Sequence, residues 1–130
     1  MPMPQAPHTT DNLKPRARLK VFTTKKDASG VDLCHVFRYS YTDSVTVRHV
    51  YAICAADRDA NISPVWKYDG VEGYMYSPVN PQPAGTVAVY RWVKPTTATY
   101  MLVPNGDQAF WTSKGFQSDG TGILGYAYLN

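Results

Sequence analysis

The chain repeats part of its own sequence, and this repetition is the strongest constraint on its fold. The segment HVFRYSY, which begins at His35, aligns with AVYRWVK, which begins at Ala88. Further motifs recur in the same order: Asp57 with Asp107, Trp66 with Phe116, Asp69-Gly70 with Asp119-Gly120, and GYMY from Gly73 with GYAY from Gly125. The alignment offset changes only between motifs, as expected when loops diverge and ordered elements do not. The sequence therefore predicts two units, 36–76 and 89–128, joined by a Pro-rich linker at 77–87.

Each predicted unit contains two strands, a short helix and a closing strand. Alternating β-branched and aromatic residues predict strands at 36–39 and 50–53 in the first unit, and at 89–93 and 100–103 in the second. Turn-forming residues between them favour hairpins. The segments AADRDANI and NGDQAFWTSKG favour short helices, the second ending at Gly115. The expected fold class is mainly β, with two tandem ββαβ-type repeats in a pseudo-two-fold relation.

The remaining parts of the chain lie before the first unit. A total of 130 residues suits one compact domain, expected at 17–130, after a flexible Pro-rich leader at 1–16. The segments RLKVFTT and VDLC predict an extra N-terminal strand segment, which we expect to cover a sheet edge. A decayed third unit is the alternative. The units could share one sheet, sit about a pseudo-two-fold axis or approximate a trefoil.

The chain has two cysteines, Cys34 and Cys54. A hairpin centred near Ser44 would place them opposite one another on one face of the sheet. A disulfide and a pair of buried thiols are equally compatible with this arrangement.

Several motifs resemble a tyrosine-rich repeat family of unknown function, which reads VYRxYNP, HFYTT, an ERD turn, GWxYEG and GYxY. Here VFRY at 36–39, HVYA at 49–52, AADRDA at 55–60 and WKYDGVEGYMY at 66–76 match it, as do VYRW, DGTG and GYAY in the second copy. The second copy departs from the pattern with Thr99 and Leu102-Val103 where the family has His and Thr-Thr. Such repeats occur in bacterial secreted proteins and cell-wall hydrolases. The resemblance implies an accessory binding role at a cell surface or wall, and an extracellular location.

The polar residues do not form a catalytic pattern. His35 and His49 have no counterparts in the second copy, and a metal site would need a third ligand, for which Asp57 and Asp59 are only distant candidates. We therefore expect a non-enzymatic protein with no catalytic residues, no metal and no cofactor.

The recurring charged residues are expected to have structural roles. The Asp57-Arg58-Asp59 segment is expected to cap a helix and form a local ion pair. The repeated Arg38 and Arg91 are expected to stack on tyrosine-rich neighbours.

The aromatic residues fall into two groups. Those at equivalent places in both copies are expected to pack in the core: Phe37, Tyr39, Tyr74, Tyr90, Trp92 and Tyr126. Others lie near unit ends or loops, where their rings could stack on a sugar or a protein partner: Trp66, Tyr68, Tyr76, Trp111 and Tyr128. Trp66 and Tyr68 are the preferred ligand-binding residues of this set.

Three functions follow from these features. The preferred one is a carbohydrate or cell-wall binding module. The first alternative is a protein-interaction or adaptor domain, associated with a phage or a secretion system. The second is nucleic-acid binding through a basic N-terminal arm: Lys14, Arg16, Arg18, Lys20, Lys25 and Lys26. The net charge of +3 supports the last only weakly. No apolar run is long enough to cross a membrane, and no signal peptide is evident. The sequence leaves the oligomeric state open.

Overall fold

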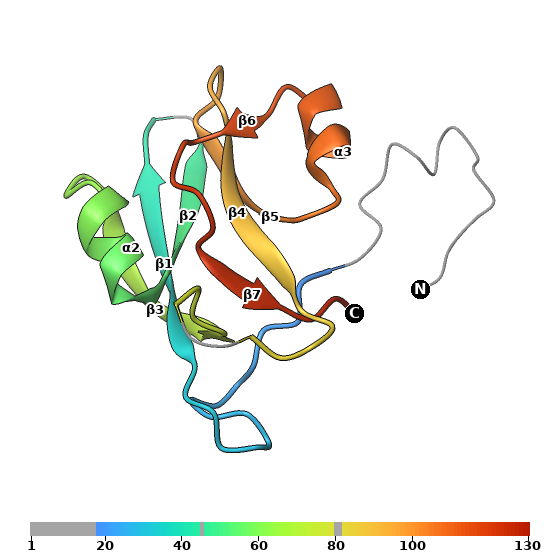
Figure 1. Ribbon diagram of the computed structural model, residues 1–130. Coiled ribbons are helices and arrows are strands. Elements are labelled where there is room, and N and C mark those ends of the chain that lie inside the picture. The colour runs from blue at the N-terminus through green and yellow to red at the C-terminus, as the bar shows by residue number, and fades with distance from the viewer. Residues whose placement is uncertain (1–17, 45, 80–81) are drawn as a thin grey trace.

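The computed structural model describes residues 18–44, 46–79 and 82–130, and its architecture is mainly β, with two antiparallel sheets and two short helices (Figure 1). The elements follow in this order: β1 (Cys34–Thr42), β2 (Val47–Ile53), α2 (Cys54–Asn61), β3 (Lys67–Met75), β4 (Val87–Lys94), β5 (Thr99–Pro104), α3 (Gln108–Ser113), β6 (Gln117–Ser118) and β7 (Gly125–Ala127). The expected fold class is confirmed at this level. The duplication of a ββαβ-type unit stays a prediction.

Each sheet is built around a central strand. In the first sheet β1 lies between β2 and β3, and in the second β4 lies between β5 on one side and β6 and β7 on the other. Helix α2 packs on the first sheet and α3 lies beside the second, on opposite sides of the molecule in Figure 1. The strands are longer than the short alternating runs predicted from sequence, since hydrogen-bonded pairing continues into residues that flank those runs.

The two halves share a hydrophobic core. Its main cluster takes buried side chains from both: Val36, Ile53, Met75, Val89, Leu124 and Ala127. Strand β2 lies against β5, and Tyr76 and Tyr126 form an antiparallel bridge between the halves. Gly125 is required at this junction, because a Cβ there would lie 2.8 Å from the carbonyl oxygen of Tyr76. A second cluster joins residues of β1 and β2 to Tyr100 of β5.

Cys34 and Cys54 form a disulfide, with their Cα atoms 4.8 Å apart. The hairpin expected from sequence is out of register by one residue, because Val36 pairs with Ile53. Cys54 does not continue β2. It is the first residue of α2 and adopts a left-handed conformation, with φ of 68°. This corner between strand and helix directs Cys54 toward Cys34.

The segment before β1 forms isolated bridges and no regular strand within the described residues, so the predicted continuous strand is not formed, while the expected covering of a sheet edge is found where Phe22 pairs with β3. Leu19 bridges to Leu129 and Phe22 bridges to Tyr74, so the segment contacts the C-terminal end and β3 in turn and does not extend one ladder. The backbone then turns at Asp27, whose side chain accepts hydrogen bonds from the amides of Ser29 and Val31. The predicted leader at 1–16 lies outside the described residues. Within the part described, no helix is both long enough and apolar enough to cross a membrane.

Candidate functional site

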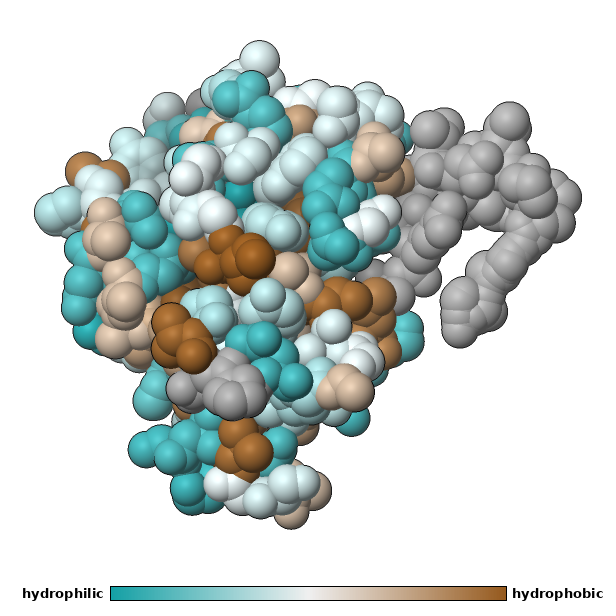
Figure 2. Space-filling model, in the orientation of Figure 1, coloured by the Kyte–Doolittle hydropathy of each residue, from teal (hydrophilic) through white to brown (hydrophobic). Residues whose placement is uncertain are grey.

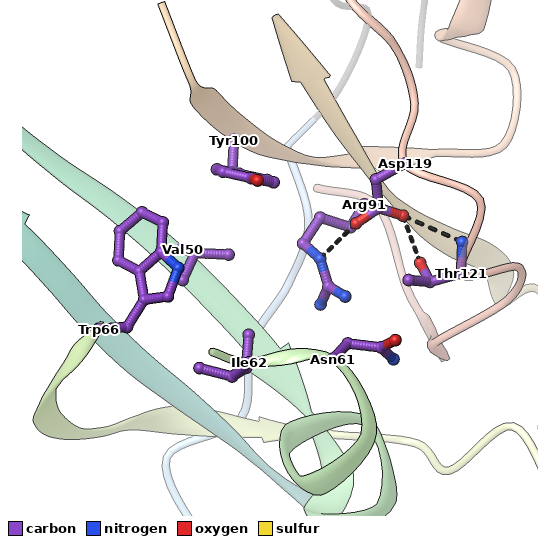
Figure 3. A pocket seen from close by; sticks show the side chains of 8 residues that line it. All are labelled: Val50, Asn61, Ile62, Trp66, Arg91, Tyr100, Asp119 and Thr121. Atoms are coloured by element: carbon purple, nitrogen blue, oxygen red, sulfur yellow. Dashed lines mark hydrogen bonds and ion pairs between the residues drawn. The ribbon is translucent and has the colours of Figure 1, made fainter. Parts of the chain in front are cut away.

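A groove of about 200 Å³ opens between the two halves (Figure 3). Its lining comes from β2, the end of α2 and the loop after it, β4, β5, and the loop after β6: Val50, Asn61, Ile62, Trp66, Arg91, Tyr100, Asp119 and Thr121. Neither half forms this groove alone, so it exists only because the two halves pack together.

One side of the groove is aromatic. Figure 3 shows Trp66 and Tyr100 on this side, with Val50 next to the indole and Ile62 below. The two rings meet edge to face with their centroids 5.8 Å apart. The amide of Trp66 donates to the carbonyl oxygen of Ser63, and this turn directs the indole back toward the second half. Both rings are only half-buried, which leaves part of each available to a ligand.

The opposite side is polar and centres on Arg91 (Figure 3). Its Nε donates to Oδ2 of Asp119 over 2.7 Å. The other oxygen of Asp119 accepts hydrogen bonds from the amide and hydroxyl of Thr121, at 3.0 and 2.6 Å. The side chain of Arg91 is 2% exposed. A charged group this deeply buried requires opposite charge and hydrogen bonds around it.

A second carboxylate, from the first half, completes the environment of Arg91. Asp57 accepts two hydrogen bonds from the guanidinium, at 2.8 and 3.0 Å, and the carbonyl oxygen of Tyr51 accepts a third at 3.0 Å. Asp57 also accepts from the amide of Ile53 and the side chain of Asn61, which places Asn61 at the edge of the groove. We define Arg91, Asp57 and Asp119 as the buried ion cluster.

The buried ion cluster keeps its arginine charged. Burial of Arg91 acts to lower the pKa of its guanidinium, but the hydrogen bonds and negative charges of Asp57 and Asp119 outweigh burial and raise the pKa above its ordinary value. Both carboxylates are occupied by Arg91 and by backbone or side-chain donors. The cluster therefore holds the groove in shape, and the surfaces left for a ligand are the aromatic rings and the polar groups of Asn61 and Thr121.

The predicted stacking of the repeated arginines on tyrosines is wrong. Arg91 is held by carboxylates because its strand faces the other half, and Arg38 forms an ion pair with Asp69. In α2 it is Arg58 that lies over an aromatic ring, that of Phe37, at 4.8 Å, while it also pairs with Asp59. Asp57 does serve the helix start, by accepting from the amide of Ile53.

Of the five aromatic residues predicted to bind a ligand, Trp66 lines the groove. Tyr68 lies on β3, 52% exposed, with its ring 5.4 Å from that of Tyr39 and outside the groove lining. Trp111 packs edge-on against Phe110 and Phe116 in the second half.

Tyr76 and Tyr128 lie together at another place. The expectation of an accessible ring at Tyr76 is wrong, because the residue is 4% exposed and its hydroxyl donates to Asp27 over 2.7 Å. Tyr128 meets Tyr76 edge to face, with centroids 6.1 Å apart. Neither residue contributes to the groove.

The sequence does not indicate the roles of Tyr100, Asp119 and Arg91 in the groove. It places Tyr100 in a strand and the other two among charges that recur in both copies. For Arg91 and Asp119, the only available signal is that an arginine and an Asp-Gly pair recur together in both copies. Nothing in the sequence shows which residues of the first half they would face.

In the described ranges, no group of three or more His, Cys, Asp or Glu residues is placed so that it could hold a metal ion.

Comparison with known proteins gives a family without an assigned activity. The model of a family described as a domain of unknown function (DUF5648) matches residues 16–127. The chain belongs to this family. The DUF5648 match includes both sheets and every residue that lines the groove. No curated protein and no solved structure matches the chain.

Proposed function

We propose that this protein is a non-enzymatic binding module whose groove holds a sugar ring of a glycan. The observation that carries the proposal is the composition of the groove, in which the rings of Trp66 and Tyr100 line one side and the polar groups of Asn61 and Thr121 the other. A sugar ring has apolar C–H faces that pack on aromatic rings, and hydroxyl groups that need hydrogen-bonding partners at its edge. The groove offers both kinds of surface on opposite sides.

The size of the groove supports a short contact with the glycan. Sites for drug-sized ligands commonly measure about 300–1,000 Å³, whereas this groove measures about 200 Å³. One ring, or the end of a chain, fits such a volume better than a long oligosaccharide does.

The ion cluster argues for binding without catalysis. Glycoside hydrolysis needs two carboxyl groups free to act on substrate, separated by roughly 5–10 Å. Here Asp57 and Asp119 both bind the same guanidinium, and Asp57 is almost completely buried. A carboxylate held in this way is unavailable as a proton donor or nucleophile.

The source of the glycan is proposed from the resemblance to repeats of bacterial secreted proteins and cell-wall hydrolases. On that basis the ligand is a cell-wall or cell-surface polymer, and the protein works outside the cell. The disulfide of Cys34 and Cys54 is compatible with an oxidising compartment. A duplication of one ββαβ-type unit would explain why both halves carry the same motifs. The groove itself is not duplicated, because its tryptophan, Trp66, comes from the first half.

The face displayed in Figure 2 suits a glycan better than a docked protein. Figure 2 shows apolar residues in small, separate patches on the face displayed, with polar residues between them. A docking surface for a protein usually presents a larger contiguous apolar area. The most exposed aromatic residue of the first sheet, Tyr68, stands outside the groove and provides a matched control for its neighbour Trp66.

The test is a pull-down on insoluble peptidoglycan combined with a glycan array, using the intact chain and two variants. Trp66→Ala is expected to weaken binding about tenfold, the loss of roughly 1.4 kcal/mol of ring contact. Tyr68→Ala, which removes an exposed ring on the following strand, should bind as the unaltered protein does. Equal retention of the protein and both variants would refute the groove as the binding site, and absence of binding to any glycan would refute the function.

A further inference from the structure

The two central strands each carry an arginine in a similar setting. Arg38 lies in β1 and Arg91 in β4, and each forms an ion pair with an aspartate that precedes a glycine of positive φ. Asp69 and Gly70 play this role for Arg38, as Asp119 and Gly120 do for Arg91. Arg38 is therefore the counterpart of Arg91 in local structure as well as in sequence.

Arg38 has one carboxylate partner among the described residues, where Arg91 has two. Its Nε lies 3.4 Å from Asp69, and its Nη2 lies 3.4 Å from Nε2 of His49. Both contacts are long compared with the contacts of 2.7 to 3.0 Å that Arg91 makes with its carboxylates. The second partner of the Arg38 guanidinium is thus the imidazole of His49 and not a carboxylate.

Two buried nitrogens in this group are poorly satisfied. Within the described part of the chain, Nε of Arg38 and Nδ1 of His49 are buried and make no hydrogen bond, although Nε has the ion-pair contact with Asp69 at 3.4 Å. If Nε2 of His49 accepts from Arg38, Nδ1 carries the proton and is a donor. A buried polar group without a hydrogen bond destabilises the folded state, so a hydrogen-bond acceptor at this place would stabilise the fold.

Arg38 is also accessible, unlike Arg91. Its side chain is 37% exposed, against 2% for Arg91. Alternation along the strands places Arg38, Ser40 and His49 on the face of the first sheet opposite to Val50, which lines the groove. The polar group formed by Arg38, Ser40, His49 and Asp69, here named the Arg38 cluster, is therefore separate from the groove.

We propose that the Arg38 cluster binds a carboxylate group supplied from outside the chain, in the way that Asp57 is bound by Arg91. The ligand is a small acidic molecule, such as a uronic sugar or an acidic amino acid. An arginine fork matches the two oxygens of a carboxylate and forms paired hydrogen bonds with it. With one bound carboxylate, Arg38 and Asp69 would reach the charge ratio of the buried ion cluster, where Arg91 is paired with the two carboxylates of Asp57 and Asp119.

The experiment is a titration of the intact ¹⁵N-labelled chain, followed by amide chemical shifts. Sodium glucuronate and sodium N-acetylglutamate represent the two ligand sources, glucose represents the ring without the charge, and sodium chloride at equal ionic strength represents anions in general. Saturable shifts are expected at Arg38, Ser40, His49 and Asp69 with one or both carboxylates. Shifts with both would assign recognition to the carboxylate alone, and shifts with one would identify its source.

Variants separate this site from the groove. Arg38→Gln should abolish the saturable shifts, and Arg38→Lys, which keeps the charge and loses the fork, should weaken the affinity at least about threefold. Trp66→Ala should leave these shifts unchanged. Carboxylate binding at the Arg38 cluster is thereby tested independently of glycan binding in the groove. The proposal is overturned if the carboxylates shift the Arg38 cluster no more than chloride does, or if the shifts persist in Arg38→Gln. Should that variant fail to fold, unaltered affinity in Arg38→Lys would overturn it as well.

Discussion

Arg38 and Arg91 occupy equivalent places in the two halves, yet one is an accessible residue with long contacts and the other is the most completely buried charge of the structure. The difference comes from what lies across from each. Arg91 faces the start of α2, which supplies Asp57, and the packing of β2 against β5 excludes water from the pair. Arg38 has no such carboxylate within the described residues, and a third of its side chain stays exposed.

This comparison shows that a motif repeated in sequence need not repeat its function. The same Arg and Asp-Gly pattern gives a buried connection between the halves in one case and a surface group in the other. Neighbours from distant parts of the chain decide the outcome, because they set both burial and the number of carboxylates.

The largest effect on stability is expected for Arg91→Gln, and Arg38→Gln is its matched comparison. Arg91→Gln removes the only positive charge of the buried ion cluster and leaves two carboxylates facing each other, which should cost about 3–5 kcal/mol of unfolding free energy. Arg38→Gln removes a partly exposed ion pair and should cost less than about 1 kcal/mol. Urea unfolding of both variants measures the contrast. Equal losses would mean that burial does not distinguish the two residues.

The disulfide gives the next largest effect, and it is confined to the first half. The bond joins residues separated by 20 positions, so removing it with Cys34→Ser and Cys54→Ser together should cost about 3 kcal/mol by the loop-closure argument. Urea unfolding with and without a reductant measures it, and the double variant should show no further response to the reductant. A protein whose stability is unaffected by either treatment would contradict the expectation.

The elements within each half could be predicted from sequence because their causes are local. Alternation of apolar residues in β1 and β4, turn residues between the paired strands, and Gly115 after α3 all act within a few residues of where they stand. Of the aromatic residues expected in the core, Phe37 and Tyr39 are buried, and the others are only half-buried: Tyr74, Tyr90, Trp92 and Tyr126. These features depend on backbone propensity and on which face a side chain points to.

The groove and its ion cluster could not be predicted in the same way. The contact between Asp57 and Arg91 depends on how one half docks on the other, and Tyr100 reaches Trp66 only through that docking. The one-residue error in hairpin register is already present at the turn, where Thr42 pairs with Val47, because the length of the loop sets the register. The left-handed conformation of Cys54 is likewise not indicated by residue type.

Tyr76 failed as a predicted ligand residue because its partner comes from the segment before β1. Asp27 accepts the hydroxyl hydrogen bond, and Phe22 packs edge-on against the ring, with centroids 5.5 Å apart. Within the described residues that segment forms isolated bridges and no regular strand before β1. No sequence pattern therefore indicates that it buries Tyr76.

The smallest predicted effect is a pH-dependent contribution to stability from Tyr76 that its counterpart in the second copy, Tyr128, does not make. Burial and the hydrogen bond to Asp27 raise the pKa of Tyr76 above its ordinary value of 10.0, so its protonated form is favoured in the folded state. This contribution to stability is complete below pH 10 and is lost as the pH rises above it. The same hydrogen bond lowers the pKa of Asp27 below 3.8, so that group's contribution is lost only as the pH falls below this value.

Tyr76→Phe should therefore cost about 1 kcal/mol near neutral pH and reduce the loss of stability above pH 10. Urea midpoints measured from pH 6 to pH 11 test both parts, with Tyr128→Phe as the matched control at the neighbouring ring. The control should keep the alkaline loss, since it leaves the bond between Tyr76 and Asp27 intact. If the two variants follow the same pH curve, the alkaline sensitivity belongs to another group, and the buried hydroxyl does not distinguish the two halves.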